Sequence, residues 1–301
     1  MKNYNFMTKS KNAFIAVAVI LVIGLVGFFI LGFNLDIDFA GGSEIHYNLG
    51  IEVTSDVRDA VKTIANDAIG SENVSSVATA SSDSNILVLR TKSLSSENRE
   101  ALEKALKEKY EKLSVESINQ FGATMSSRTV KTVVLSTLIA VAAMLIYIWI
   151  RFQLASGIAA IVCLIFNLFA MFTLYSFAQI PVNSNVIAAC LTILGYSINN
   201  TIVIFDRVRE NIKKDPHKTF EEHANNGIHE TLNRSVFSTI TTLLTIGMVY
   251  ILGVEQIRYF ALPLIIGIIA GLFSSIFIAC PVWGIFRKLL GTGDKKKEEK
   301  K

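Results

Sequence analysis

Residues 186–211 read VIAACLTILGYSINNTIVIFDRVREN. The run is apolar and long enough to cross a bilayer as a helix, and it ends at Asp206 and Arg207. Two adjacent amides, Asn199 and Asn200, lie past its midpoint. Hydrocarbon offers no water to an amide, so these side chains need protein partners or a wet path. The stretch therefore predicts a membrane span that carries function.

The whole chain is apolar enough for several such spans. Of its 301 residues, 51% are hydrophobic, and the mean hydropathy is +0.46, which exceeds what a soluble domain needs. Each of six apolar runs has roughly the 20 residues that a spanning helix requires. The runs cover residues 13–33, 132–150, 154–178, 186–205, 235–254 and 259–286. We predict a polytopic α-helical membrane protein with six transmembrane helices, the first a retained anchor rather than a cleaved signal peptide.

The distribution of charge predicts the orientation of these helices. Residues 34–131 hold 11 Lys and Arg against 15 Asp and Glu, a net charge of −4. Basic residues instead gather in the N-terminal segment 1–12, in the loop 207–234 and in the basic tail 287–301. By the positive-inside rule, both termini are cytoplasmic and residues 34–131 lie outside. Helices 2–6 then occupy residues 132–286.

Residues 34–131 predict one exported α+β domain between helices 1 and 2. Alternating apolar residues predict strands at 43–49, 73–79, 86–91 and 113–119, and helical spacing predicts helices at 54–69 and 96–112. The order β-α-β-β-α-β is that of a ferredoxin-like fold. This fold hosts many functions and indicates none by itself.

Two further segments carry structural expectations. In the loop 207–234, Phe220, Ala224, Ile228 and Leu232 are spaced four apart, which predicts a short amphipathic helix at the membrane surface or against the bundle. We expect His217, His223 and His229 of this region to be solvated rather than metal ligands. The sixth run holds Pro263 and Pro281, which predict kinks, and a GIIAG motif at 267–271 that is either a close helix contact or a chance pattern.

Polar residues form a stripe on two neighbouring spans. Thr192, Gly195 and Asn199 share one face of the fourth span. On the fifth span, polar residues recur at helical spacing, and the set is Arg234, Ser238, Thr241 and Thr245. Because a surface loop joins the two spans, we expect them to pair and the Asn199/Asn200 amides to meet this stripe.

Each of these polar groups also has a structural interpretation. Asn, Ser and Thr commonly hydrogen-bond spans together, at about 0.6 kcal/mol per contact. Arg234 is either a functional intramembrane cation or a side chain that snorkels to the headgroups. Asp206 and Arg207 fit a helix C-terminus on the cytoplasmic side.

No catalytic constellation is present in the sequence. There is no GxSxG, HExxH, Walker or CxxC motif, so we expect no enzymatic activity, no cofactor, no metal and no nucleic-acid partner. Three cysteines, Cys163, Cys190 and Cys280, fall inside predicted spans and are expected to pack as small apolar residues. Work done by such a chain draws on a gradient or on a partner.

Three stretches resemble the SecF family of the bacterial protein-export machinery. LTILGYSINNTIVIFDRVREN (191–211), with Gly195, Tyr196, Asp206 and Arg207, is similar to its fourth-span signature. HETLNRSVFSTITTLLTI (229–246) is similar to its fifth span. LDIDFAGGSEI (35–45) resembles the motif after its first span, and it contains Asp38, Gly41 and Gly42, where local sequence predicts a tight turn at the glycines.

The resemblance implies a role in the bacterial cytoplasmic membrane. SecF works with SecD beside the SecYEG channel, with accessory insertase subunits as further candidates, and acts on translocating polypeptides outside the lipid bilayer. The pair resembles proton-driven exporters of the resistance-nodulation-division superfamily, which implies use of the proton-motive force in late export. Asn199, Asn200, Arg234 and Ser238 are then the candidates for the ion path.

The chain departs from the family pattern at the position that matters most. The signature usually reads Gly-Tyr-Ser-x-Asn-Asp, and its aspartate position here is Asn200, which cannot carry a proton. A SecD carboxylate then serves, or the coupling ion differs, or this copy is weakly coupled. Another departure is Phe121-Gly122-Ala123, where the family often has Gly-Pro before the second span. Two alternative functions stay open: half of a small-solute or lipid exporter of the same superfamily, and a passive scaffold for membrane-protein insertion.

Overall fold

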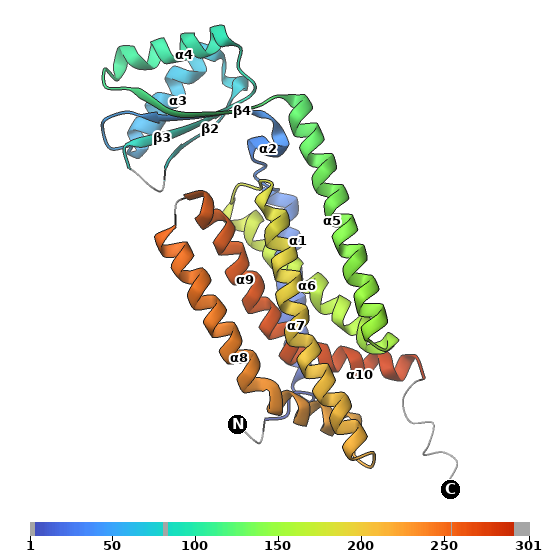
Figure 1. Ribbon diagram of the computed structural model, residues 1–301. Coiled ribbons are helices and arrows are strands. Elements are labelled where there is room, and N and C mark those ends of the chain that lie inside the picture. The colour runs from blue at the N-terminus through green and yellow to red at the C-terminus, as the bar shows by residue number, and fades with distance from the viewer. Residues whose placement is uncertain (1–3, 81–83, 254, 292–301) are drawn as a thin grey trace.

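A computed structural model describes residues 4–80, 84–253 and 255–291. A small sheet domain stands at one end of a helical bundle, and a long helix descends from it beside the bundle (Figure 1). The elements are α1 (Ser10–Leu31), α2 (Ile37–Ala40), β1 (Gly42–Asn48), α3 (Ser55–Ile69), the 3-10 helix η1 (Ser71–Asn73), β2 (Val74–Thr79), β3 (Ile86–Thr91), α4 (Ser96–Lys109), β4 (Ser114–Phe121), α5 (Ala123–Arg151), α6 (Leu154–Ala178), α7 (Asn185–Lys214), α8 (Phe220–Leu252), α9 (Glu255–Phe277) and α10 (Ala279–Leu289).

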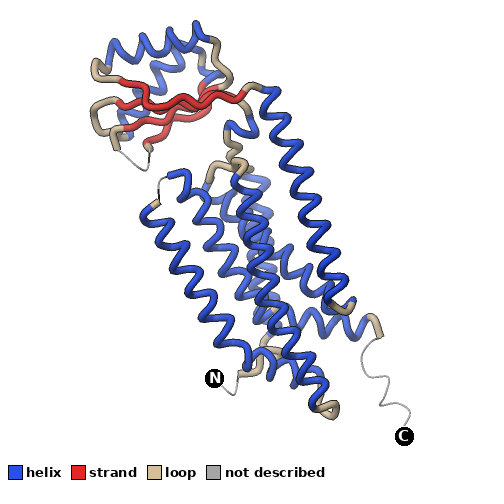
Figure 2. Tube along the Cα trace, viewed as in Figure 1, coloured by secondary structure: helices blue, strands red, loops and turns tan. Residues whose placement is uncertain are grey.

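The domain between α1 and α5 has the predicted ferredoxin-like fold. Its antiparallel sheet has the strand order β2-β3-β1-β4, and α3 and α4 cover the face that points away from the bundle (Figures 1 and 2). Ile45 and Tyr47 on β1 and Leu102 and Leu106 on α4 are fully buried between the layers. The opposite face of the sheet is polar and is turned toward the bundle.

Six helices are long and apolar enough to span a membrane, as predicted. In the most apolar stretches of α6, α7 and α9, 50% of residues are buried, against at most 11% in α1, α5 and α8. The first three therefore form the centre of the bundle. The other three expose wide apolar faces, which suits contact with lipid or with another membrane protein.

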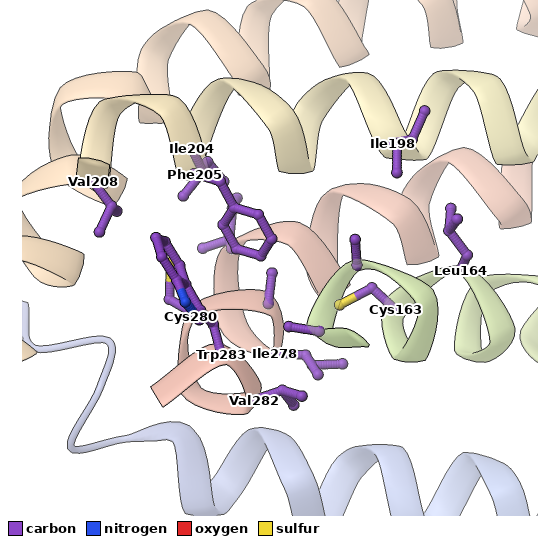
Figure 3. Packing of buried hydrophobic residues seen from close by; sticks show 14 of the residues in the cluster. Cys163, Leu164, Ile198, Ile204, Phe205, Val208, Ile278, Cys280, Val282 and Trp283 are labelled. Atoms are coloured by element: carbon purple, nitrogen blue, oxygen red, sulfur yellow. The ribbon is translucent and has the colours of Figure 1, made fainter. Parts of the chain in front are cut away.

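A cluster of apolar side chains closes the bundle at the end opposite the sheet. Phe205 of α7 and Trp283 of α10 point toward one another, with ring centroids 4.8 Å apart (Figure 3). Around them lie small and branched side chains from α6, α7 and α10: Cys163, Leu164, Ile198, Ile204, Val208, Ile278, Cys280 and Val282. The three cysteines are buried and free, in line with a packing role.

The sixth predicted span was too long. Helix α9 ends at Phe277, and α10 begins at Ala279 and runs across the end of the bundle (Figure 1). Pro281 lacks an N–H, and inside a continued helix its ring would clash with the Phe277 carbonyl. Pro281 instead lies in the first turn of α10, where proline is tolerated. Pro263 does lie inside α9, as predicted.

Two other boundaries differ from the prediction. Helix α5 begins at Ala123, so the sheet domain ends at Phe121 rather than at residue 131, and Gly122 is the helix cap. The amphipathic segment after residue 219 is not a separate helix, because it continues into the fifth span as α8. A capping box of Thr219 and Glu222 starts this helix, and nothing in the sequence up to residue 252 stops it.

The amphipathic half of α8 packs against the bundle. Ala224 and Ile228 are completely buried. His223 is also buried, at 3% exposure, so the prediction that it is solvated was wrong. His223 lies on the same buried face of α8 as Ala224 and Ile228. This face packs against the bundle because α8 is one continuous helix. His217 is exposed, and His229 Nε2 lies 2.7 Å from the Tyr4 carbonyl oxygen.

The GIIAG motif is a close helix contact. A Cβ added at Gly267 would lie 2.2 Å from Ile193, and one at Gly271 would lie 3.1 Å from Ser197. Both neighbours belong to α7. The two glycines thus allow the backbones of α9 and α7 to approach each other in the centre of the bundle.

Candidate functional site

The two amides of α7 lie on different faces of the helix. Asn199 is exposed, on the same face as Thr192 and Gly195. A Cβ at Gly195 would meet no atom within 4 Å, so nothing in the described chain covers this face. Asn200 is buried, at 4% exposure, and its Nδ2 has no hydrogen-bond acceptor in the described part of the chain.

A buried polar network surrounds Asn200, and the sequence analysis did not single it out. Asn167 of α6 donates from Nδ2 to Ser197 Oγ, and Thr201 Oγ1 lies 2.9 Å from Ser275 Oγ of α9. An asparagine inside an apolar run was the available signal for Asn167, since burying an amide is costly in any span. The network ties α7 to both central neighbours at the level of the amides.

The predicted pairing of α7 with α8 is confirmed. Tyr196 Oη lies 3.2 Å from Thr239 Oγ1, and farther along a Cβ at Gly227 would lie 2.6 Å from Val208. In this antiparallel register Arg234 stands level with Thr201. That level is about 7 Å inside Asp206, counted along the helix axis at 1.5 Å per residue.

The α8 stripe does not meet the amides within this chain, so that expectation was wrong. Arg234, Ser238, Thr241 and Thr245 are all exposed. The three hydroxyls donate to carbonyl oxygens of their own helix rather than across to α7, so they do not join the two spans. Arg234 has no hydrogen bond or ion pair to any residue that the structure describes. The face of α8 that holds Thr239, not the stripe, is the one that contacts α7.

Asp206 and Arg207 lie inside α7, which continues to Lys214, so the prediction that the helix ends at these residues was wrong. Asp206 Oδ2 accepts from Arg151 Nη2 at 2.5 Å, which ties α7 to the end of α5. Arg207 donates to Glu230 of α8 and, at 2.6 Å, to Glu210. These ion pairs link α7 to α5 and α8, and they favour a structural role for both residues over a site of chemistry.

Asp38 links the base of the sheet domain to the start of α7. Its Oδ2 accepts from the backbone N–H of Ser184 at 3.1 Å and from Ser184 Oγ at 2.7 Å, just before α7 begins. Gly41 and Gly42 follow α2 and both have positive φ. The motif after the first span therefore fixes the turn into β1 and holds the start of the helix that carries the amides.

A charged cavity of about 420 Å³ lies between the sheet and the outer ends of the helices. Arg90 Nε donates to Glu44 Oε2 at 2.6 Å and lies 3.6 Å from Asp36 Oδ1. Glu44 Oε1 also lies 3.0 Å from His46 Nε2. Burial opposes the charge of Glu44, but His46 and Arg90 outweigh it and lower the pKa of Glu44. Burial dominates at Asp36 and raises its pKa.

We expect Arg90→Gln to destabilise the exported domain at neutral pH by about 1–2 kcal/mol, because it leaves Glu44 without its cation. The lowered pKa of Glu44 means that its stabilising contribution is present above its unfolded pKa and is lost as pH falls through its folded pKa. The difference between variant and parent should therefore shrink in acid. Urea unfolding of the full chain at pH 7 and pH 3.5 measures it, and an equal difference at both pH values would contradict the assignment.

No group of three His, Cys, Asp or Glu side chains able to hold a metal is present among the described residues. At the level of Asn199 and Arg234, the polar side chains of α7 and α8 are amides, hydroxyls and Arg234. Two sets of residues therefore remain as candidates. One is the polar layer of α7 and α8, and the other is the charged cavity under the sheet.

Comparisons with known proteins agree on one family. Residues 101–289 match the family model "Protein export membrane protein SecD/SecF, C-terminal". The SecF protein translocase subunit of Dictyoglomus turgidum is 34% identical over 96% of this chain and 99% of its own length. The SecDF subunit of Bacillus subtilis is 32% identical over 94% of this chain and 38% of its own.

A solved structure has the same fold. The crystal structure of SecDF from Thermus thermophilus, described as a translocon-associated membrane protein, superposes with a TM-score of 0.85 at 27% identity. It covers 95% of this chain, and this chain spans 39% of that one. The family assignment rests on three observations: a six-helix bundle, a ferredoxin-like domain after the first helix, and relatives that match over nearly their full length. The chain is a multi-pass membrane protein that belongs to the SecF branch of the SecD/SecF family of protein export membrane proteins.

Proposed function

We propose that this chain is an auxiliary, non-enzymatic subunit of the Sec translocase that works with a SecD partner. Together they use an ion gradient, the proton-motive force in the first instance, to promote late stages of export beside the SecYEG channel. The sheet domain lies outside and both chain ends lie in the cytoplasm. The charge distribution supports this orientation, because Arg151, Arg207 and Arg287 lie at the end of the bundle opposite the sheet.

One observation carries the proposal. Asn199 and Arg234 lie on exposed faces of two adjoining spans, at nearly the same level and between about one and two turns inside the level of Asp206. A charge and an amide facing hydrocarbon would be costly, so this surface needs a protein partner or a wet path. A SecD subunit is the partner that the SecDF relatives offer, because their single chains extend well beyond the length matched here.

The ion path we propose runs along the faces of α7 and α8 that hold Asn199 and Arg234, where the SecD partner would cover them. It does not run through a carboxylate of this chain. Asn200 occupies the position where the family pattern has an aspartate. Among the described residues Arg234 has no ion-pair partner, because Glu230, one turn earlier on α8, pairs with Arg207, so an acid from the partner is needed to exchange charge with Arg234. Such an arrangement requires one titrating carboxylate per complex rather than one per subunit.

Asn200→Asp tests the position directly. We expect export driven by the proton-motive force to stay equal to that of the parent or to rise, because burial at 4% exposure keeps the new carboxyl neutral until the path hydrates. Transport of a secreted precursor into inverted vesicles, with SecD co-expressed, measures it. The matched control is Asn199→Asp, on the exposed face, which should impair export by placing a fixed charge at the partner surface. Loss of the complex with SecD in the Asn200 variant would contradict a tolerant ion path.

A further inference from the structure

A second cavity lies at the end of the bundle opposite the sheet, and it is basic. It encloses about 810 Å³ between the α5–α6 connection, the last turns of α7, and α10. Four cations line it: Arg151, Arg209, Lys213 and Arg287. Asp206 pairs with two of them, at 2.5 Å from Arg151 and 3.7 Å from Arg209, and no Asp or Glu is among the described residues that line the cavity. The cavity therefore carries an excess of positive charge.

Arg209 is held in place and still lacks one acceptor. Its guanidinium lies over the rings of Phe152 and Trp283, 5.0 and 5.9 Å from their centroids, and Nη2 donates to Ser156 Oγ at 2.8 Å. Its Nε is buried and has no hydrogen-bond partner in the described part of the chain. A buried guanidinium donor without an acceptor is costly, so the site is built for an incoming oxygen.

The N-terminus of α6 opens into the same cavity. Gln153, Leu154 and Ala155 line it, and the Gln153 side chain makes no capping hydrogen bond. The first turn of a helix has N–H groups without intrahelical partners, and these groups favour a phosphate or another anion. The helix end and the arginines thus point to the same ligand chemistry.

The surroundings of the cavity are those of the membrane boundary. Trp149, Ile150 and Leu154 beside it are exposed by 78%, 77% and 61%, and Leu289 of α10 by 73%. A free phosphate or an acidic peptide would gain nothing from such side chains, whereas acyl chains would cover them. Basic pockets between spans at this level bind anionic headgroups. We propose that this cavity binds the phosphate headgroup of an anionic phospholipid and anchors α10 and the end of α7 to the leaflet.

The chain offers a built-in probe for the test. It has two tryptophans, Trp149 and Trp283, and Trp283 lines the cavity. In a Trp149→Phe background, the fluorescence of Trp283 is followed in detergent while dioctanoylphosphatidylglycerol is added. Parallel titrations use dioctanoylphosphatidylcholine and inorganic phosphate at matched ionic strength. We expect a saturable change with the anionic lipid alone.

Charge-removing variants assign the binding to this cavity. Lys213→Gln with Arg287→Gln removes two lining cations, and we expect the apparent Kd to rise about 30-fold, since each basic residue near a membrane surface contributes on the order of a factor of 5 to 6. The matched control, Lys214→Gln with Lys288→Gln, removes two neighbouring cations that are paired with Glu210 and Glu221, outside the cavity. It should leave Kd unchanged.

Four outcomes would overturn the proposal. An equal response to inorganic phosphate would make the cavity a free-anion site. An equal response to phosphatidylcholine, or equal weakening in the cavity and control variants, would mean that the lipid is attracted without a specific site. The absence of any saturable change with phosphatidylglycerol would exclude headgroup binding beside Trp283.

Discussion

Arg234→Ala is expected to reduce proton-motive-force-dependent export to the level measured without this chain. Arg234 stands level with Thr201 inside the span, on an exposed face, and no described residue neutralises it. An intramembrane arginine costs about 2.5–3.5 kcal/mol, which a fold keeps only where the charge is used. Export of a secreted precursor into energised inverted vesicles measures the loss, and immunoblotting of the membranes shows that the variant is still inserted.

Two further variants separate a functional charge from a snorkelling side chain. Arg234→Lys keeps the charge and should retain part of the activity. Lys218→Ala removes a cation of the loop between α7 and α8, where Lys218 pairs with Asp215, and should have no effect. If Arg234→Ala exported normally, Arg234 would be an interfacial side chain that reaches the headgroups, and the proposed ion path would lose its cation.

Gly42→Val is expected to unfold the side of the sheet domain that lies next to the bundle. Gly42 has φ of +131°, and a Cβ there would lie 2.3 Å from the Thr91 carbonyl oxygen. A β-branched residue meets both the backbone strain and the clash with β3, and we expect a cost of about 3 kcal/mol or more. Amide hydrogen exchange in β1 and β3 of the full chain should then accelerate on the order of 100-fold.

Gly122→Ala is the matched glycine control. Gly122 has φ of −66°, and a Cβ there would meet no atom within 4 Å. Its exchange pattern should equal that of the parent, and α5 should keep its start at Ala123. If hydrogen exchange in β1 of the Gly42 variant stayed slow, the turn after α2 would be able to accommodate a side chain. The requirement for glycine at position 42 would then be contradicted.

The fold was predictable from the sequence because periodicity reports burial directly. Runs of about 20 apolar residues have one stable form in a bilayer, and alternating or helical spacing predicted the four strands and the helices α3 and α4 of the sheet domain to within a few residues. The errors came where a local break competes with a long apolar run. Pro281 ended α9 inside one continuous run, whereas nothing ended α8 between its polar and apolar halves.

The candidate site was predictable only in part. The sequence gives the depth of a residue along its span, but it does not give which neighbouring helix, if any, covers that residue. The sequence by itself determined the six spans, the ferredoxin-like domain between the first two of them, and the level of Asn199, Asn200 and Arg234 along their spans. Only the tertiary structure decided that Asn200 is buried while Asn199 and Arg234 face outward. Successive residues of a helix differ by about 100° in direction, so adjacent amides point to different neighbours, and the packing of α6, α8 and α9 around α7 selects which of them the chain covers.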